Sequence, residues 1–120
     1  MAAHILVVED SELVTGAFRI LLEDAGYRVS VAGTLVGAIA EAVSGPVDVM
    51  LLDLSLPDGD GLAALGRLRE LGAPPKVTIA MTGDDEPATR TRCIEAGCAE
   101  VLIKPVSIRE LRSSIARHLS

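Results

Sequence analysis

Four apolar segments of this chain each end in side chains that can bind a cation or take part in chemistry. Residues 5–8 lead into Glu9 and Asp10, residues 47–52 into Asp53, residues 77–81 into Thr82, and residues 101–103 into Lys104. A carboxylate that ends a buried strand is costly unless a metal, a partner or solvent receives it. If the four segments are parallel strands, three carboxylates, one hydroxyl and one ammonium group meet at one edge of a sheet.

Such a cluster suits phosphoryl chemistry. Three neighbouring carboxylates repel one another unless a cation lies between them. Mg²⁺ fits this role because it prefers oxygen ligands, keeps several waters and bridges to phosphoryl oxygens. With Mg²⁺ bound, one carboxylate can attack an activated phosphorus atom and form an acyl phosphate. Lys104 can then offer a positive charge, and Thr82 a hydrogen bond, to the charge that develops on the equatorial oxygens.

The elements that must position these residues alternate between short strands and amphipathic helices. We expect strands near residues 4–9, 27–32, 47–53, 76–82 and 99–104. Helices are expected after Ser11, after Thr34, from about Leu62, at Pro87 and after Ser107, which forms a capping-box spacing with Glu110. Five strand–helix units predict an open parallel sheet rather than an eight-stranded barrel. Sites in such sheets lie beyond the carboxyl ends of the strands, where the strand order reverses.

The apolar periodicity also predicts which helix positions face the core. For the first two helices these are Val14, Phe18, Leu21, Leu22 and Ala25, then Val36, Ile39, Ala40 and Val43. For the last three they are Leu62, Leu65 and Leu68, then Cys93, Ile94 and Ala96, then Ile108, Leu111, Ile115 and Leu119.

Length, charge and composition narrow the class of protein. A chain of 120 residues fits a single domain over residues 1–120, and its core must be aliphatic because Phe18 and Tyr27 are the only aromatic residues. The net charge of −6 gives no overall attraction to nucleic acid. No apolar stretch approaches the about 18 residues of a membrane helix, and the N-terminus lacks a secretory signal, so a cytoplasmic location is expected. Cys93 and Cys98 are expected to be small core residues.

The order of these residues resembles the receiver domain of bacterial two-component response regulators, the CheY-like family. The matching set is Glu9-Asp10, Asp53 with Pro57 and Gly61 downstream, Thr82, and Lys104-Pro105. The resemblance extends over residues 4–119. It implies a (βα)5 flavodoxin-like fold with strand order 2-1-3-4-5. It also implies a phosphoacceptor switch in phosphorelay signalling, which takes part in its own phosphorylation and autodephosphorylation but is not an enzyme.

The resemblance assigns a role to each residue of the metal site. It implies that Asp10 and Asp53 bind Mg²⁺ directly, that the backbone carbonyl of Ser55 is a further ligand, and that Glu9 acts through a metal-bound water. Read as a calcium loop, the acids at 58–61 fail, because position twelve is Arg69 rather than Glu. Turn chemistry accounts for them better.

The resemblance likewise assigns the phosphoryl chemistry. Asp53 is the implied phosphoacceptor, Lys104 contacts the phosphoryl group, and the Thr82 hydroxyl moves to it. The Lys104-Pro105 bond is expected to be cis. Ser55 and Asp84 occupy positions that flank the path of the hydrolytic water in this family.

Two positions depart from the family pattern. Val101 stands where the family usually has Tyr or Phe, so a ring that swings inward when the threonine moves cannot operate here. Val106 stands where Phe is common, which reduces packing at the start of the last helix. The residue after the switch threonine, Gly83, is small and keeps access to Asp53 open.

The phosphoryl donor is expected to be a sensor histidine kinase or a histidine phosphotransfer protein, or else a small acyl phosphate. The chain has no Gly-rich Lys-Ser/Thr loop for direct use of ATP. Its limits fit a stand-alone receiver, and the receiver half of a larger regulator is the close variant. The downstream target is open, with no nucleic acid or membrane partner expected for this chain.

Two other classes of function compete with the switch. A phosphorylation-independent scaffold would typically have lost the nucleophile, an acid or the lysine, and this chain has kept them all. A Mg²⁺-dependent phosphatase would need a second aspartate two residues after the nucleophile, where this chain has Ser55.

Overall fold

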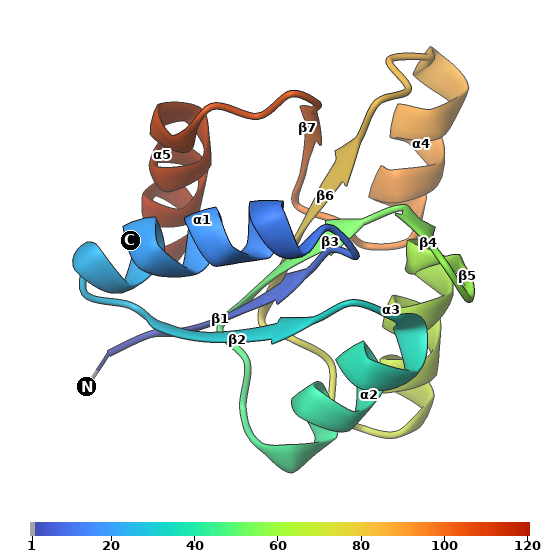
Figure 1. The fold of residues 1–120 in the computed structure, drawn as a ribbon. Helices are drawn as coiled ribbons and strands as arrows, with labels where there is room; N and C mark the ends of the chain where they lie inside the picture. Colours follow the sequence, from blue (N-terminus) through green and yellow to red (C-terminus); the bar gives the residue numbers. More distant parts are fainter. Residues whose placement is uncertain (1) are drawn as a thin grey trace.

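The computed structural model describes residues 2–120, and its centre is a parallel sheet (Figure 1). The five strands of this sheet are β1 (His4–Val8), β2 (Arg28–Ala32), β3 (Val49–Asp53), β6 (Val77–Thr82) and β7 (Glu100–Ile103). They lie in the order β2-β1-β3-β6-β7, which is the predicted order 2-1-3-4-5. The fold class is therefore confirmed, and the strand order reverses between β1 and β3.

Helices cover both faces of the sheet (Figure 1). They are α1 (Glu12–Asp24), α2 (Leu35–Ser44), α3 (Gly61–Glu70), α4 (Pro87–Glu95) and α5 (Ile108–Leu119). Alternate strand residues feed two separate cores, because successive side chains point to opposite faces. Ile5 and Leu51 pack with Leu22 of α1 and Leu111 of α5. Leu6, Leu52 and their neighbours instead pack with α2, α3 and α4.

The predicted helix starts at Ser11, Thr34 and Ser107 are confirmed as N-caps. The Ser11 hydroxyl accepts the Val14 N–H at 3.4 Å, and the Ser107 hydroxyl accepts the Glu110 N–H at 3.1 Å. Thr34 caps α2 in the same way. Each cap satisfies a backbone donor that has no partner inside its helix. Pro87 begins α4 as predicted.

The predicted buried face of α2 is wrong. Val36 and Val43 are 73% and 55% exposed, whereas Ala38 and Ala42 are buried. The sequence of α2 is apolar on nearly all sides, so periodicity does not select one stripe. The buried stripe instead carries the small residues Ala38 and Ala42, where α2 packs on the sheet and on α3.

Two further predicted core positions lie at the surface. Leu21 of α1 and Ile94 of α4 are 38% and 55% exposed. Each is next in sequence to a residue that is fully buried, Leu22 and Cys93 respectively, and successive side chains of a helix point in directions about 100° apart.

A short antiparallel hairpin, which we did not predict, follows β3. Its strands are β4 (Ser55–Leu56) and β5 (Gly59–Asp60), and it joins the end of β3 to the start of α3. Its pairing is Ser55 with Asp60 and Leu56 with Gly59.

Both cysteines are buried as free thiols, as predicted. Burial raises the pKa of Cys98 to about 12 and also raises the pKa of Cys93, so neither thiol is readily ionised. Within residues 2–120, the helices are too short or too polar to cross a bilayer.

Candidate functional site

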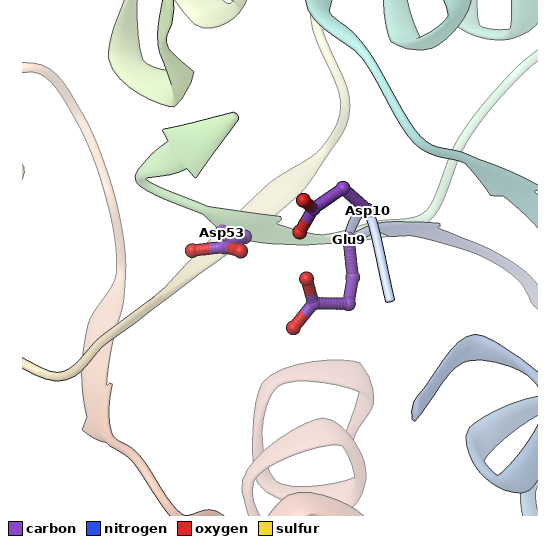
Figure 2. A group of neighbouring side chains, drawn as sticks. All are labelled: Glu9, Asp10 and Asp53. Atoms are coloured by element: carbon purple, nitrogen blue, oxygen red, sulfur yellow. The ribbon is translucent and has the colours of Figure 1, made fainter. Parts of the chain in front are cut away.

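The predicted acids meet at the carboxyl edge of the sheet, at the point where the strand order reverses. Glu9 and Asp10 follow β1 and Asp53 ends β3, and Val8 pairs with Leu52 in the register of these two strands. One carboxylate oxygen from each of the three acids lies within 4.8 Å of the others. Figure 2 shows the three carboxyl groups gathered beyond the ends of the strands.

These acids differ in their contact with solvent. Asp53 and Glu9 are only 3% and 5% exposed, whereas Asp10 is exposed. Burial of two carboxylates side by side is unfavourable unless positive charge compensates them. The site must therefore recruit a cation from the protein, from solution, or from both.

Lys104 is the protein's own cation at this site. Its Nζ atom lies 3.0 Å from Glu9 Oε1 and 3.0 Å from Asp53 Oδ2. Burial alone lowers the pKa of Lys104, but the hydrogen bonds to Glu9 and Asp53 outweigh it, so this pKa is raised above its usual value. The ammonium group is thus held in its charged form between the two carboxylates.

One ammonium group does not balance three carboxylates. The donor set that is left is made of oxygen atoms, with the Asp10 carboxylate open to solvent. Small hard cations such as Mg²⁺ prefer this donor type and keep waters on their open side. The residues present therefore fit the metal that the resemblance implies.

The second oxygen of Asp53 is fixed by the backbone. Asp53 Oδ1 accepts the N–H of Ser55 at 3.1 Å, and Ser55 itself is exposed. The chain then returns so closely that the Gly61 N–H donates to the Leu54 carbonyl at 2.9 Å. A Cβ atom at Gly61 would collide with the Asp53 carbonyl oxygen, so this return requires glycine.

Thr82 lies at the end of β6, next to the strand that carries Asp53. Met81 pairs with Asp53 in the register, which brings Thr82 to the same edge. Its hydroxyl accepts the Asp84 N–H at 3.1 Å, and in the described part of the chain it makes no hydrogen bond to Asp53. Thr82 is therefore near the site with its hydroxyl turned to the following loop.

Asp84 is engaged by α4 rather than by the acids. Its Oδ2 atom accepts the Thr89 hydroxyl at 2.6 Å and its Oδ1 atom accepts the Glu86 N–H at 2.9 Å. The Thr89 hydroxyl, followed by the Glu86 amide, lowers the pKa of Asp84. This carboxylate thus links the loop after β6 to the first turn of α4.

Three sequence features around Lys104 were singled out by the family resemblance: the Lys104-Pro105 bond, Val101 and Val106. The Lys104-Pro105 bond is cis, as the resemblance implied. Val101 is buried in the core beneath α2, α3 and α4. Val106 is half-buried against the core beneath α1 and α5.

Sequence reasoning missed the partners of two acids in the hairpin. Asp58 accepts backbone N–H groups from Leu35 at 2.7 Å and Val36 at 3.2 Å, at the start of α2. Asp60 caps α3 through the Leu62 N–H at 2.9 Å and forms an ion pair with Arg92 of α4. The alternating acids of residues 58–61 were the available signal, but local spacing does not reveal partners that lie more than twenty residues away.

An open parallel sheet with an acid cluster at its order reversal defines a doubly wound α/β domain with a ligand site at its carboxyl edge. Residues 5–116 match the family described as the response regulator receiver domain. The chain belongs to this family, and it is a phosphoacceptor switch of two-component signalling.

Three relatives illustrate the similarity. The KDP operon transcriptional regulatory protein KdpE of Escherichia coli (strain K12) is 35% identical over 112 residues, which are 93% of this chain and 49% of KdpE. A CheY-like receiver domain from Methanospirillum hungatei JF-1 superposes with a TM-score of 0.91 at 27% identity, covering 99% of this chain and 94% of that one. The non-phosphorylated receiver domain of HemR from Leptospira biflexa gives a TM-score of 0.88 at 29% identity, covering 98% and 94%.

The lengths of the relatives differ from that of this chain. The chain spans about half the length of the curated regulators KdpE and ResD that it matches. In the solved receiver domains, by contrast, it covers nearly the whole chain. Receiver domains of response regulators take their phosphoryl group from histidine kinases.

Proposed function

We propose that Asp53 is the phosphoacceptor of this receiver domain and that its phosphorylation depends on Mg²⁺. The observation that carries the proposal is the position of its carboxylate. Asp53 Oδ2 lies 3.0 Å from Lys104 Nζ, and one carboxylate oxygen each of Glu9, Asp10 and Asp53 lie within 4.8 Å of one another, close enough to bind one metal ion. Asp53 is the acid with a contact to each part of the site: the lysine, the other acids and the Ser55 amide.

We assign the metal ligands among residues of this edge. Asp10, Asp53 and the backbone carbonyl of Ser55 would hold Mg²⁺ directly, and Glu9 would act through a bound water. When bound, Mg²⁺ neutralises charge on the carboxylates and on the incoming phosphoryl oxygens. The exposure of Asp10 supports this assignment, since Mg²⁺ retains waters and needs an open side.

The chain's own residues account for the transfer step. An oxygen of Asp53 forms a bond to phosphorus while the phosphorus–nitrogen bond of a phosphohistidine breaks, and its electron pair stays on the imidazole nitrogen of the donor. Lys104 gives a fixed positive charge beside the equatorial oxygens. The Thr82 hydroxyl would leave the Asp84 N–H to bond a phosphoryl oxygen.

The partner and setting follow from this chemistry. The donor would be a sensor histidine kinase or a histidine phosphotransfer protein, with a small acyl phosphate as a substitute in vitro. We further propose that residues 1–120 form one receiver domain that works in the cytoplasm. The domain would contribute to its own phosphorylation and autodephosphorylation without turning over an outside substrate.

Intact-mass measurement tests the proposal. The protein is incubated with Mg²⁺ and acetyl phosphate, and we expect one added phosphoryl group in the wild type and none in Asp53→Asn. Omission of Mg²⁺ should suppress the adduct. If the wild type forms no adduct and binds no beryllofluoride, the chain is a phosphorylation-independent scaffold instead.

A further inference from the structure

We propose that Asp58 is a positioning residue for the metal site, because its carboxylate fastens the β4–β5 hairpin to the first turn of α2. The hairpin begins at Ser55, two residues after Asp53, so its position sets the place of the Ser55 carbonyl. The inference rests on the proposed function, in which that carbonyl is a metal ligand.

The hairpin needs an anchor outside itself. Each of its strands has only two residues, and the pairs are Ser55 with Asp60 and Leu56 with Gly59. Isolated two-stranded hairpins are marginally stable at best in water, even when they are longer. The geometry of the Ser55 backbone must therefore come from the contacts between the hairpin and the rest of the domain.

Leu56 holds the hairpin to the core, and Asp58, at the turn, makes its hydrogen bonds to α2. Its two oxygens accept the N–H groups of Leu35 at 2.7 Å and of Val36 at 3.2 Å. Both are first-turn amides of α2 that lack a partner inside the helix, and a carboxylate there also interacts favourably with the helix dipole. The Leu35 amide lowers the pKa of Asp58, consistent with a charged carboxylate held in this place.

The next residue shows how closely the turn lies on α2. Gly59 has a φ of 145°, and a Cβ atom there would lie 2.9 Å from Leu35 Cδ1. Leu35 is thus touched by the turn through both its backbone and its side chain. The turn and α2 are therefore in direct contact. Loss of the Asp58 carboxylate would remove the hydrogen bonds across this contact and let the hairpin move away from α2.

The other end of the hairpin is held more weakly. Asp60 pairs with Arg92 of α4, but the two side chains are 46% and 55% exposed. Exposed ion pairs contribute little because solvent screens them and because two long side chains must be ordered. The Asp60 cap on Leu62 fixes the start of α3 rather than the turn.

The position of the hairpin affects the Asp53 side chain as well as the Ser55 carbonyl. The Ser55 N–H donates to Asp53 Oδ1 at 3.1 Å, so a shift of Ser55 changes an acceptor oxygen and a ligand together. Groups that orient metal ligands commonly change metal affinity by about 10- to 100-fold when they are removed. Since Asp58 acts through a backbone segment, we expect the lower end of that range.

The test measures Mn²⁺ binding to the whole chain by electron paramagnetic resonance of the free ion, in wild type, Asp58→Ala and Asp58→Asn. We expect Asp58→Ala to weaken binding about tenfold. Asp58→Asn keeps an oxygen acceptor for the Leu35 amide, so it should weaken binding by only about two- to threefold, the share due to charge. Equal weakening in Asn and Ala would show a charge effect alone and would overturn the proposal.

The matched control is Asp24→Ala, which removes the same charge at the end of α1 and should leave Mn²⁺ affinity unchanged. A second readout needs no metal: amide hydrogen exchange at Ser55 should speed up severalfold in Asp58→Ala and far less in Asp58→Asn. If wild type binds no Mn²⁺, the proposed function fails, and the exchange experiment still decides whether Asp58 holds the hairpin.

Discussion

At the amino edge of the sheet Asp48 has a partner for each oxygen, whereas at the carboxyl edge three carboxylates cluster and Lys104 contacts two of them, Glu9 and Asp53. Asp48 Oδ2 accepts the His4 N–H at 2.7 Å, and its Oδ1 atom lies 3.1 Å from Lys76 Nζ. The His4 amide, followed by Lys76, lowers the pKa of Asp48. This acid is balanced by the protein alone.

The buried histidine beside Asp48 is balanced in the same way. Its Nδ1 atom donates to the Pro46 carbonyl at 2.8 Å, and its Nε2 atom is 2.7 Å from the Ser30 hydroxyl. His4 thus uses both ring nitrogens in hydrogen bonds within the fold. The carboxyl edge, by contrast, concentrates charge that its own residues leave uncompensated. The excess negative charge at the carboxyl edge is therefore consistent with a binding site for a cation. The paired charges at the amino edge are consistent with a purely structural role.

The largest expected effect of this difference is stabilisation by Mg²⁺. At a free Mg²⁺ concentration one hundred times its dissociation constant, the free energy of unfolding should rise by about 2.7 kcal/mol. Urea unfolding followed by circular dichroism measures this change. In Asp10→Asn most of the gain should disappear. An equal gain in that variant, or with NaCl of matched ionic strength, would indicate simple screening.

Removal of the proposed nucleophile should stabilise the metal-free protein. Asp53→Asn keeps the shape of the side chain but removes one of three repelling charges. Unit charges about 4 Å apart interact by about 1 kcal/mol in water and about 4 kcal/mol near a protein surface. Because Lys104 loses one partner at the same time, we expect a net gain of about 1 kcal/mol in urea unfolding with EDTA. A loss of stability would contradict the idea of an unbalanced edge.

The same substitution at the amino edge should have the opposite sign and a slightly smaller size. Asp48→Asn should lower the free energy of unfolding at pH 7 by about 0.8 kcal/mol, since a charge-assisted hydrogen bond is weakened. The pKa of Asp48 is lowered in the folded state from 3.8, so its contribution is complete above that pH and is lost as the pH falls through the folded value.

The pH dependence of the urea midpoint checks this assignment. The difference between wild type and Asp48→Asn should shrink below about pH 4. Lys76→Ala is the control, and it should cost less than about 0.5 kcal/mol because the lysine side chain is 73% exposed. A difference that is constant from pH 3 to 7 would show that the Asp48 charge does not stabilise the fold.

Much of this architecture could be predicted because its signals are local. Apolar runs that end in polar residues located four of the five strands of the main sheet, and hydroxyl residues located three helix starts. The family resemblance supplied the strand order. Once the carboxyl ends of parallel strands share an edge, the meeting of Asp53 with Glu9 and Lys104 follows from the topology.

What could not be predicted depends on space and on distant partners. The buried face of α2 is the one that carries Ala38 and Ala42, and a sequence that is apolar on nearly all sides does not single out this face. The role of Asp58 depends on amides more than twenty residues earlier in the chain. The orientation of the Thr82 hydroxyl reflects a hydrogen bond from the Asp84 N–H that any threonine at a strand end can make or omit.

Gly61 has a consequence for the tolerance of this site to mutation. Every other amino acid brings a Cβ atom that overlaps the carbonyl oxygen of Asp53. In a library randomised at codon 61 and selected for phosphoryl acceptance, survivors should carry glycine, although this residue has no side chain to offer a ligand or a proton. The site therefore requires the absence of a side chain at residue 61 as strictly as it requires charged side chains at the acids and at Lys104.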